Sequence, residues 1–80
     1  MVSGISIYPN PSNGELFVKS VVNIKDAIVY NAIGQKITRF PITNNLTPLD
    51  LSNFENGVYF LSLLDNNSDV LTTQKIIINK

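Results

Sequence analysis

The chain has 80 residues, enough for one small domain, and its six basic residues balance six acidic ones. The cations are scattered, which excludes the clustered charge of a nucleic-acid surface, and no apolar stretch reaches the roughly 18 residues of a membrane-spanning helix. The chain has no cysteine, which excludes disulfides and thiolate metal sites, but its 44% of hydrophobic residues is enough for a core.

The apolar residues recur with a period near two in short runs, and turn residues bound nearly every run. This pattern is typical of β-strands, and no window shows the sustained i, i+3, i+4, i+7 stripe of a helix. The expected strands cover residues 5–8, 16–19, 27–30, 35–40, 47–52, 58–64 and 70–78. Seven strands at this spacing predict an all-β sandwich. Pro41 and Pro48 cannot donate to a ladder, so their strands should lie at an edge or a bulge.

Turn chemistry is densest between the first two expected strands. Pro9 and Pro11 fix φ near −65°, and Asn13-Gly14 tolerates positive φ. A linker would need no tyrosine in front of this segment and no apolar run directly behind it. The sequence therefore predicts a stiff corner inside the fold, and a further turn at residues 31–34.

Strand alternation divides the apolar side chains into two sets. The set expected to face the core is Leu16, Val18, Ala27, Val29, Tyr59, Leu61 and Leu63. The set then turned outward is Phe17, Ile28, Tyr30, Phe60 and Leu64. An exposed apolar set of this kind often marks a partner surface, and the alternative is that both faces of the central strands are partly covered.

The residue types give little support for catalysis. The chain has no histidine and no cysteine, so the usual nucleophile–base pairs are absent. Paired-carboxylate chemistry would need two carboxylates to meet in a cleft, and a small sandwich filled by its own side chains offers little cleft. We therefore expect no enzymatic activity and no cofactor.

Two kinds of loop motif each have a structural and a functional interpretation. Residues 65–69 place oxygen ligands at positions 1, 3 and 5 of a calcium loop, but Val70 and Ile76 replace the required glycine and glutamate. We expect a polar hairpin loop without a metal. The segments 45–47 and 66–68 match the N-glycosylation pattern, and we expect exposed loops there.

Tyr59 follows Gly57 at the start of an expected strand. It either stacks against a ligand or is a buried tyrosine whose hydroxyl bonds nearby backbone, as in the tyrosine corner of immunoglobulin-like folds. We favour the structural role.

Several segments, in their order and spacing, together resemble a known family: 8–11 followed by 14–18, then 29–37, then 49–52 followed by 56–61, and finally 74–80. It is the C-terminal sorting domain of proteins exported by the type IX secretion system of Bacteroidetes, also called the Por secretion system C-terminal domain. The resemblance covers almost the whole chain. The motif residues to which we assign structural roles are Tyr8, Pro9, Asn10, Pro11, Gly14, Gly34, Gly57 and Tyr59.

The resemblance implies an immunoglobulin-like antiparallel β-sandwich of about seven strands, carried at the end of a larger cargo protein. Such a domain takes its cargo from the periplasm through an outer-membrane translocon. A sortase-like cysteine protease then usually removes it and often joins the cargo to an anionic lipopolysaccharide, at the outer membrane surface or outside the cell. Met1 begins the chain where a cargo domain should precede it, so we expect residues 1–80 to be a single domain excised from a larger secreted protein.

The resemblance also makes the C-terminus part of what the translocon recognises. The residues concerned are Lys75, Ile76, Ile77, Ile78, Asn79 and Lys80. The other interpretation of this stretch is a last strand with a solvated tail. Because termini fray easily, we expect this end to be the most exposed part of the chain, and the fold to survive the loss of its last three residues.

Two functions from different classes remain. The first is a secretion-targeting domain that carries a cargo through the translocon and is then cleaved off. The second is an immunoglobulin-like carbohydrate-binding or adhesive module. Position in the parent gene separates them, because a sorting domain lies at the extreme C-terminus whereas an adhesive module is often internal or repeated.

Overall fold

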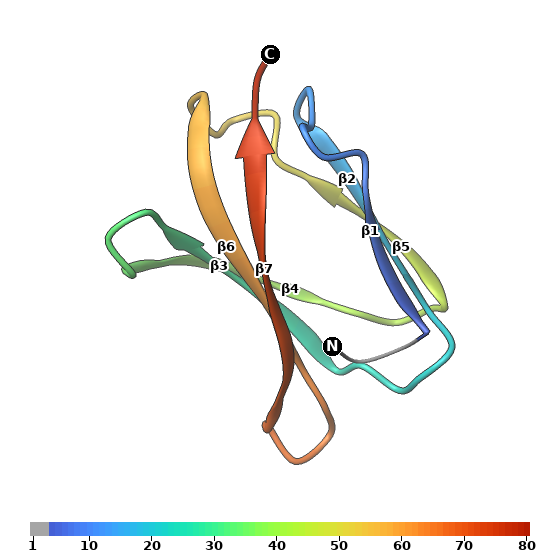
Figure 1. Cartoon of the computed structure of the whole chain (residues 1–80). Helices are drawn as coiled ribbons and strands as arrows, with labels where there is room; N and C mark the ends of the chain where they lie inside the picture. Colours follow the sequence, from blue (N-terminus) through green and yellow to red (C-terminus); the bar gives the residue numbers. More distant parts are fainter. Residues whose placement is uncertain (1–3) are drawn as a thin grey trace.

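The computed structural model describes residues 4–80, and within this range the chain forms seven β-strands and no helix (Figure 1). The strands are β1 (Ile5–Tyr8), β2 (Glu15–Ser20), β3 (Asp26–Asn31), β4 (Lys36–Pro41), β5 (Leu46–Asp50), β6 (Gly57–Leu64) and β7 (Val70–Ile78). The seven expected strands are all present, and their ends differ from the prediction by at most two residues. The all-β prediction is confirmed.

The strands form two antiparallel sheets that face each other (Figure 1). One sheet has the order β1-β2-β5 and the other the order β4-β3-β6-β7. This is the division of an immunoglobulin-like sandwich, with the fourth strand placed beside β3. Pro41 lies in β4 and Pro48 in β5, and both strands are sheet edges, as the missing N–H of proline requires.

The core lies between the two sheets and is made by alternate residues of their inner faces. All seven side chains predicted to face inward are buried there. The remaining core residues come mainly from β5 and β7 and the loops beside them: Ile24, Leu49, Leu51, Ile76 and Ile78. Tight packing of these large aliphatic side chains is the main stabilising term in a domain this small.

The predicted outward set is only partly exposed. Phe17, Tyr30, Phe60 and Leu64 are half-buried, and Ile28 is buried at 9% exposure. Their cross-strand neighbours cover part of each side chain, so the outer faces of the central strands are partly covered, as the alternative interpretation held.

The turn at residues 31–34 is also confirmed. The Oδ1 of Asn31 accepts hydrogen bonds from the backbone N–H groups of Ile33 and Gln35, at 3.1 and 2.9 Å. Gly34 has a φ of 87°, a conformation that glycine adopts without a steric penalty. These contacts close the β3–β4 hairpin.

Candidate functional site: the C-terminal strand and its clasp

The segment 75–80, predicted to carry recognition, divides into core and surface positions. Ile76 and Ile78 are each 1% exposed and pack into the core. Lys75, Asn79 and Lys80 are exposed, and Ile77 is half-buried. Strand alternation explains the split, because successive side chains of β7 point to opposite faces of the sheet. Only the outward side chains of β7 are therefore open to contact from outside.

The side-chain amide of Asn10 pairs with the backbone of β7 from the corner between β1 and β2. Its Nδ2 donates to the carbonyl oxygen of Lys75 at 2.9 Å, and its Oδ1 accepts from the N–H of Ile77 at 3.0 Å. A residue of a neighbouring parallel strand would make the same two bonds with its own N–H and C=O. Asn10 thus acts as a substitute peptide group beside Ile76.

Ser12 adds a second contact of the same kind, now with its backbone. Its N–H donates to the carbonyl oxygen of Ile77 at 2.7 Å, and its carbonyl oxygen accepts from the N–H of Asn79 at 2.8 Å. These bonds form an isolated parallel bridge between Ser12 and Ile78. We call residues 10–12 the clasp. The clasp occupies the backbone edge of β7 that would otherwise be open over residues 75–79, and it lies at the same end of the sandwich as the C-terminus (Figure 1).

The clasp is itself held by the local structure of the corner. Ser12 is 1% exposed. Its hydroxyl donates to the carbonyl oxygen of Glu15 at 2.6 Å and accepts from the N–H of Gly14 at 3.1 Å. Both Xaa–Pro bonds of the corner, Tyr8–Pro9 and Asn10–Pro11, are cis. The corner expected inside the fold is present, and it contacts the other end of the chain.

The last residue is bound to the loop between β5 and β6. The N–H of Lys80 donates to Oδ1 of Asn56 at 2.9 Å, and its Nζ donates to the carbonyl oxygen of Ser52 at 2.8 Å. The expected exposure holds for Asn79 and Lys80 but is wrong for Ile76 and Ile78, which are core residues, and Lys80 is hydrogen-bonded through both its backbone and its side chain. The last three residues include a fully buried side chain.

The loop that receives Lys80 begins with a turn at Asp50. Oδ1 of Asp50 accepts from the N–H of Ser52 at 2.9 Å. Hydrogen bonds from Ser52, its side chain first and its backbone second, lower the pKa of Asp50. Because the pKa is lowered, the hydrogen bonds to ionised Asp50 stabilise the folded state. This stabilisation is present above the ordinary carboxyl pKa and is lost as the pH falls through the lowered value.

Gly14 lies where the corner, the β5–β6 loop and the terminus meet. Its φ is 116°, and a Cβ built there would lie 3.4 Å from Cα of Ser52 and 3.6 Å from Cδ of Lys80. Its carbonyl oxygen accepts from the N–H of Leu51 at 2.8 Å. The backbone needs glycine here for both conformation and space.

We expect Gly14→Ala to lower the free energy of unfolding by about 1 kcal/mol or more, through backbone strain. Gly34 also has a positive φ, of 87°, but nothing lies within 4 Å of a Cβ built there. Gly34→Ala therefore isolates the effect of φ, and urea denaturation of both variants should show the larger loss at Gly14. Equal losses would mean that the contact with Ser52 is unimportant.

Tyr59 has the structural role expected of it. Its hydroxyl donates to the carbonyl oxygen of Glu55, four residues upstream, at 2.7 Å. Its ring is 9% exposed and lies 5.3 Å, centroid to centroid, from the ring of Phe54. This is the tyrosine corner of an immunoglobulin-like fold, at the start of the equivalent strand. Gly57, at the beginning of the same strand, has a φ of 156°.

The polar loop at residues 65–69 is closed by its own hydrogen bonds. Oδ1 of Asp65 accepts from the N–H groups of Asn67 and Asp69, at 2.8 and 3.0 Å. Within residues 4–80 no three His, Cys, Asp or Glu side chains gather into a group that could hold a metal. The loop is a hairpin turn, and the prediction that it binds no metal stays a prediction. The asparagines of both glycosylation motifs, Asn45 and Asn66, are exposed. The loop expected over residues 45–47 is wrong beyond Asn45, because Leu46 and Thr47 lie in β5 and Thr47 is buried.

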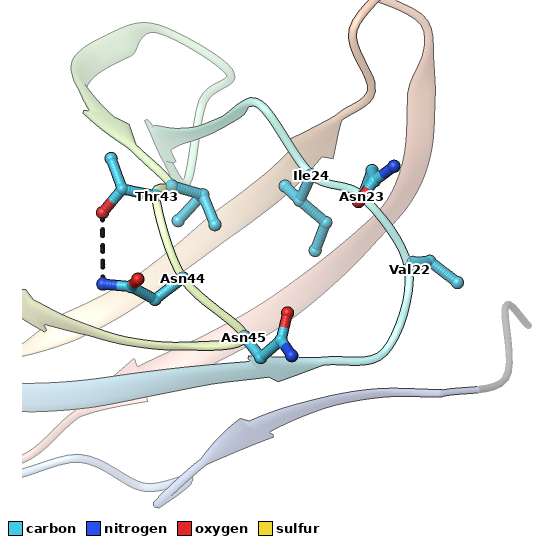
Figure 2. A pocket seen from close by; sticks show the side chains of 7 residues that line it. Val22, Asn23, Ile24, Thr43, Asn44 and Asn45 are labelled. Carbon is cyan, nitrogen blue, oxygen red and sulfur yellow. Dashed lines mark hydrogen bonds between the residues drawn. The ribbon is translucent and has the colours of Figure 1, made fainter.

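A small cavity of about 90 Å³ lies between the β2–β3 and β4–β5 loops (Figure 2). It is lined by Val22, Asn23, Ile24, Ile42, Thr43, Asn44 and Asn45. Apart from asparagine-rich turns, nothing in the sequence indicates this cavity. Its lining has no titratable group, and its volume is well below the roughly 300 Å³ at which ligand pockets begin.

The sequence reasoning identified the corner, the tyrosine and the terminal strand but not the contacts between them. It missed Ser12, Ser52 and Asn56 as partners of the C-terminal segment. The one sequence signal for these contacts was Asn10, a polar residue between two prolines, and its role as a turn residue already explained it.

Comparison with known families gives one match. The family model described as the secretion system C-terminal sorting domain matches residues 6–79. Comparison with the curated proteins finds no match for the chain. Among residues 4–80, no helix has the length and apolar character needed to cross a membrane.

Proposed function

The chain belongs to the family of secretion system C-terminal sorting domains, and we propose from this premise that it works by displaying outward side chains of β7 on a rigid strand. It is a C-terminal sorting signal for type IX secretion, the tail of a cargo protein that is secreted or held at the cell surface. A sorting signal of this kind is not catalytic, and the proposed mechanism requires no enzymatic activity of the domain.

The observation that carries the mechanism is the clasp. Edge strands are commonly recognised by backbone pairing with an added strand, but Asn10 and Ser12 already occupy the edge of β7 over residues 75–79. Backbone pairing at this end would need the clasp to be displaced. We therefore assign recognition by the translocon to the side chains of Lys75, Ile77, Asn79 and Lys80, with Ile76 and Ile78 serving the fold.

We propose the partners and the route that membership of this family supports. The cargo passes from the periplasm through the outer-membrane translocon of the type IX system. A sortase-like cysteine protease then cleaves the domain from its cargo, which reaches the outer membrane surface or the medium.

A reporter fusion in a host with a type IX system tests the function. The reporter carrying the intact domain should be exported, and the reporter alone should stay in the periplasm. Ile77→Thr should reduce export, because it removes an outward apolar group but keeps a β-branched residue in the strand. Val70→Thr is the matched control: Val70 is also in β7 and is 60% exposed. A fusion with the intact domain that remained in the periplasm would contradict sorting and favour the adhesive module, and equal export of both variants would contradict recognition through Ile77.

A further inference from the structure

The outer face of the four-stranded sheet carries a row of side chains that crosses all four strands. Lys75 is opposite Phe60, and Phe60 is opposite Tyr30. Tyr30 pairs with Lys36 of β4 at the point where the β3–β4 register shifts, between Val29 and Tyr30. In the next row, Ile77 is opposite Val58. Cross-strand partners lie on the same face with their Cβ atoms about 5 Å apart. We call these six residues the cationic aromatic face.

Burial of the neighbouring positions fixes the direction of the side chains in β6 and β7. Tyr59 and Leu61 flank Phe60, and Ile76 and Ile78 flank Ile77, and all four are core residues. Alternation then points Phe60 and Ile77 away from the core. Val58 is 39% exposed, and Tyr30, Phe60 and Ile77 are half-buried. The face thus continues the recognition segment of β7 across its own sheet.

Charge is divided unequally between the two outer faces, although the chain is neutral. Among residues 4–80 there is one ion pair, between Arg39 Nε and Asp26 Oδ1 at 3.3 Å, and it lies on the same sheet. Lys36 and Lys75 have no carboxylate partner in that range. The opposite sheet places Glu15 directly across from Asp50. The outer face of the four-stranded sheet therefore has two lysines outside any ion pair, whereas that of the three-stranded sheet has Glu15 and Asp50 at one end and Lys19 at the other.

We propose that the cationic aromatic face docks onto a protein of the secretion machinery whose contact surface is apolar and carries carboxylates opposite Lys36 and Lys75. The proposal rests on the sorting function and extends the recognised surface from β7 to β3, β4 and β6. A second aromatic pair, Tyr8 and Phe17, stacks on the opposite sheet with ring centroids 5.7 Å apart. That face is acidic at one end and does not include the outward side chains of β7.

Charge reversal inside and outside this face tests whether the face is recognised. Lys36→Glu with Lys75→Glu should reduce export of the fused reporter about tenfold or more, because like charges facing each other across an interface are strongly unfavourable. Lys19→Glu with Lys25→Glu changes the net charge equally, at exposed positions outside this face, and should leave export within about twofold of the intact domain. Circular dichroism and melting of each purified variant report whether it is folded. If the glutamate pair does not fold, Lys36→Gln with Lys75→Gln removes the cations without adding repulsion and should still reduce export.

The following outcomes would contradict the proposed docking face or its protein partner. If the two double variants are exported equally well, or lose export equally, then the cationic aromatic face is not the docking surface. Failure of the intact domain to direct export overturns the sorting function itself. Purified domain that sediments with lipopolysaccharide vesicles, and loses this binding on reversal of Lys36 and Lys75, would replace the protein partner by an anionic lipid. Self-association of the purified domain that the same reversal abolishes would replace it by a second copy of the chain.

Discussion

Deletion of Ile78, Asn79 and Lys80 is expected to destabilise the domain severely. Ile78 is 1% exposed in the core, and loss of a buried isoleucine side chain costs about 2–5 kcal/mol. The deletion also removes the bond from Asn79 to Ser12 and both hydrogen bonds of Lys80. A domain of 80 residues has a total stability of roughly 4–12 kcal/mol. The loss is therefore a large part of the total, and urea denaturation followed by circular dichroism measures it.

Two further variants divide this effect into its parts. Ile78→Ala keeps the strand and should account for most of the loss, whereas deletion of Lys80 alone removes two exposed hydrogen bonds and should cost about 1–3 kcal/mol at most. A domain truncated after Ile77 that kept the intact midpoint of unfolding would show that Ile78 is not part of the core. The result also bears on sorting. If the truncated domain fails to export its cargo, the failure can come from loss of the fold or from loss of the recognised residues. Single outward substitutions in β7 avoid that ambiguity.

Much of the fold follows from local sequence. The period-two pattern locates seven strands because one face of each strand must be buried while the other meets water or a thin covering of side chains. Pro41 and Pro48 identify β4 and β5 as edges because proline lacks the N–H that an inner strand needs. Tyr59, placed just after a glycine at a strand start, indicates the tyrosine corner. Each of these inferences depends on residues that are close in sequence.

The clasp could not be predicted because it joins residues far apart in the chain. Asn10 between two prolines is fully explained as a turn residue, and nothing local indicates that its amide binds the backbone of β7. The run Ile76-Ile77-Ile78 hides its own alternation, because three equal side chains do not show which of them faces the core. The predicted exposure of the terminus is therefore wrong at Ile76 and Ile78, and the contacts that hold this segment come from the β1–β2 corner and the β5–β6 loop.

Replacement of Asn10 should loosen the C-terminal strand without touching the core. Asn10→Ala removes the bonds to the Lys75 carbonyl and the Ile77 N–H, and two such bonds contribute about 1–3 kcal/mol. Asn10→Asp should cost at least as much at pH 7, because a carboxylate accepts from Ile77 but cannot donate to Lys75 and repels its carbonyl oxygen. Urea denaturation of both variants at pH 7 measures the loss, and hydrogen exchange at Ile77 and Asn79 should show the weakened edge.

The aspartate variant adds a pH test of the same geometry. Once protonated, the introduced carboxyl can donate to the Lys75 carbonyl, so its pKa in the folded state is raised above the ordinary value of about 3.9. A raised pKa means that the regained stability is present at low pH and is lost as the pH rises through the folded-state value. The gap in stability between Asn10→Asp and the intact domain should therefore narrow on acidification. Asn13, exposed in the same corner, supplies the matched controls Asn13→Ala and Asn13→Asp. If these controls lose as much stability as the Asn10 variants, or if the gap does not change with pH, then the amide of Asn10 does not act as a substitute peptide group for β7.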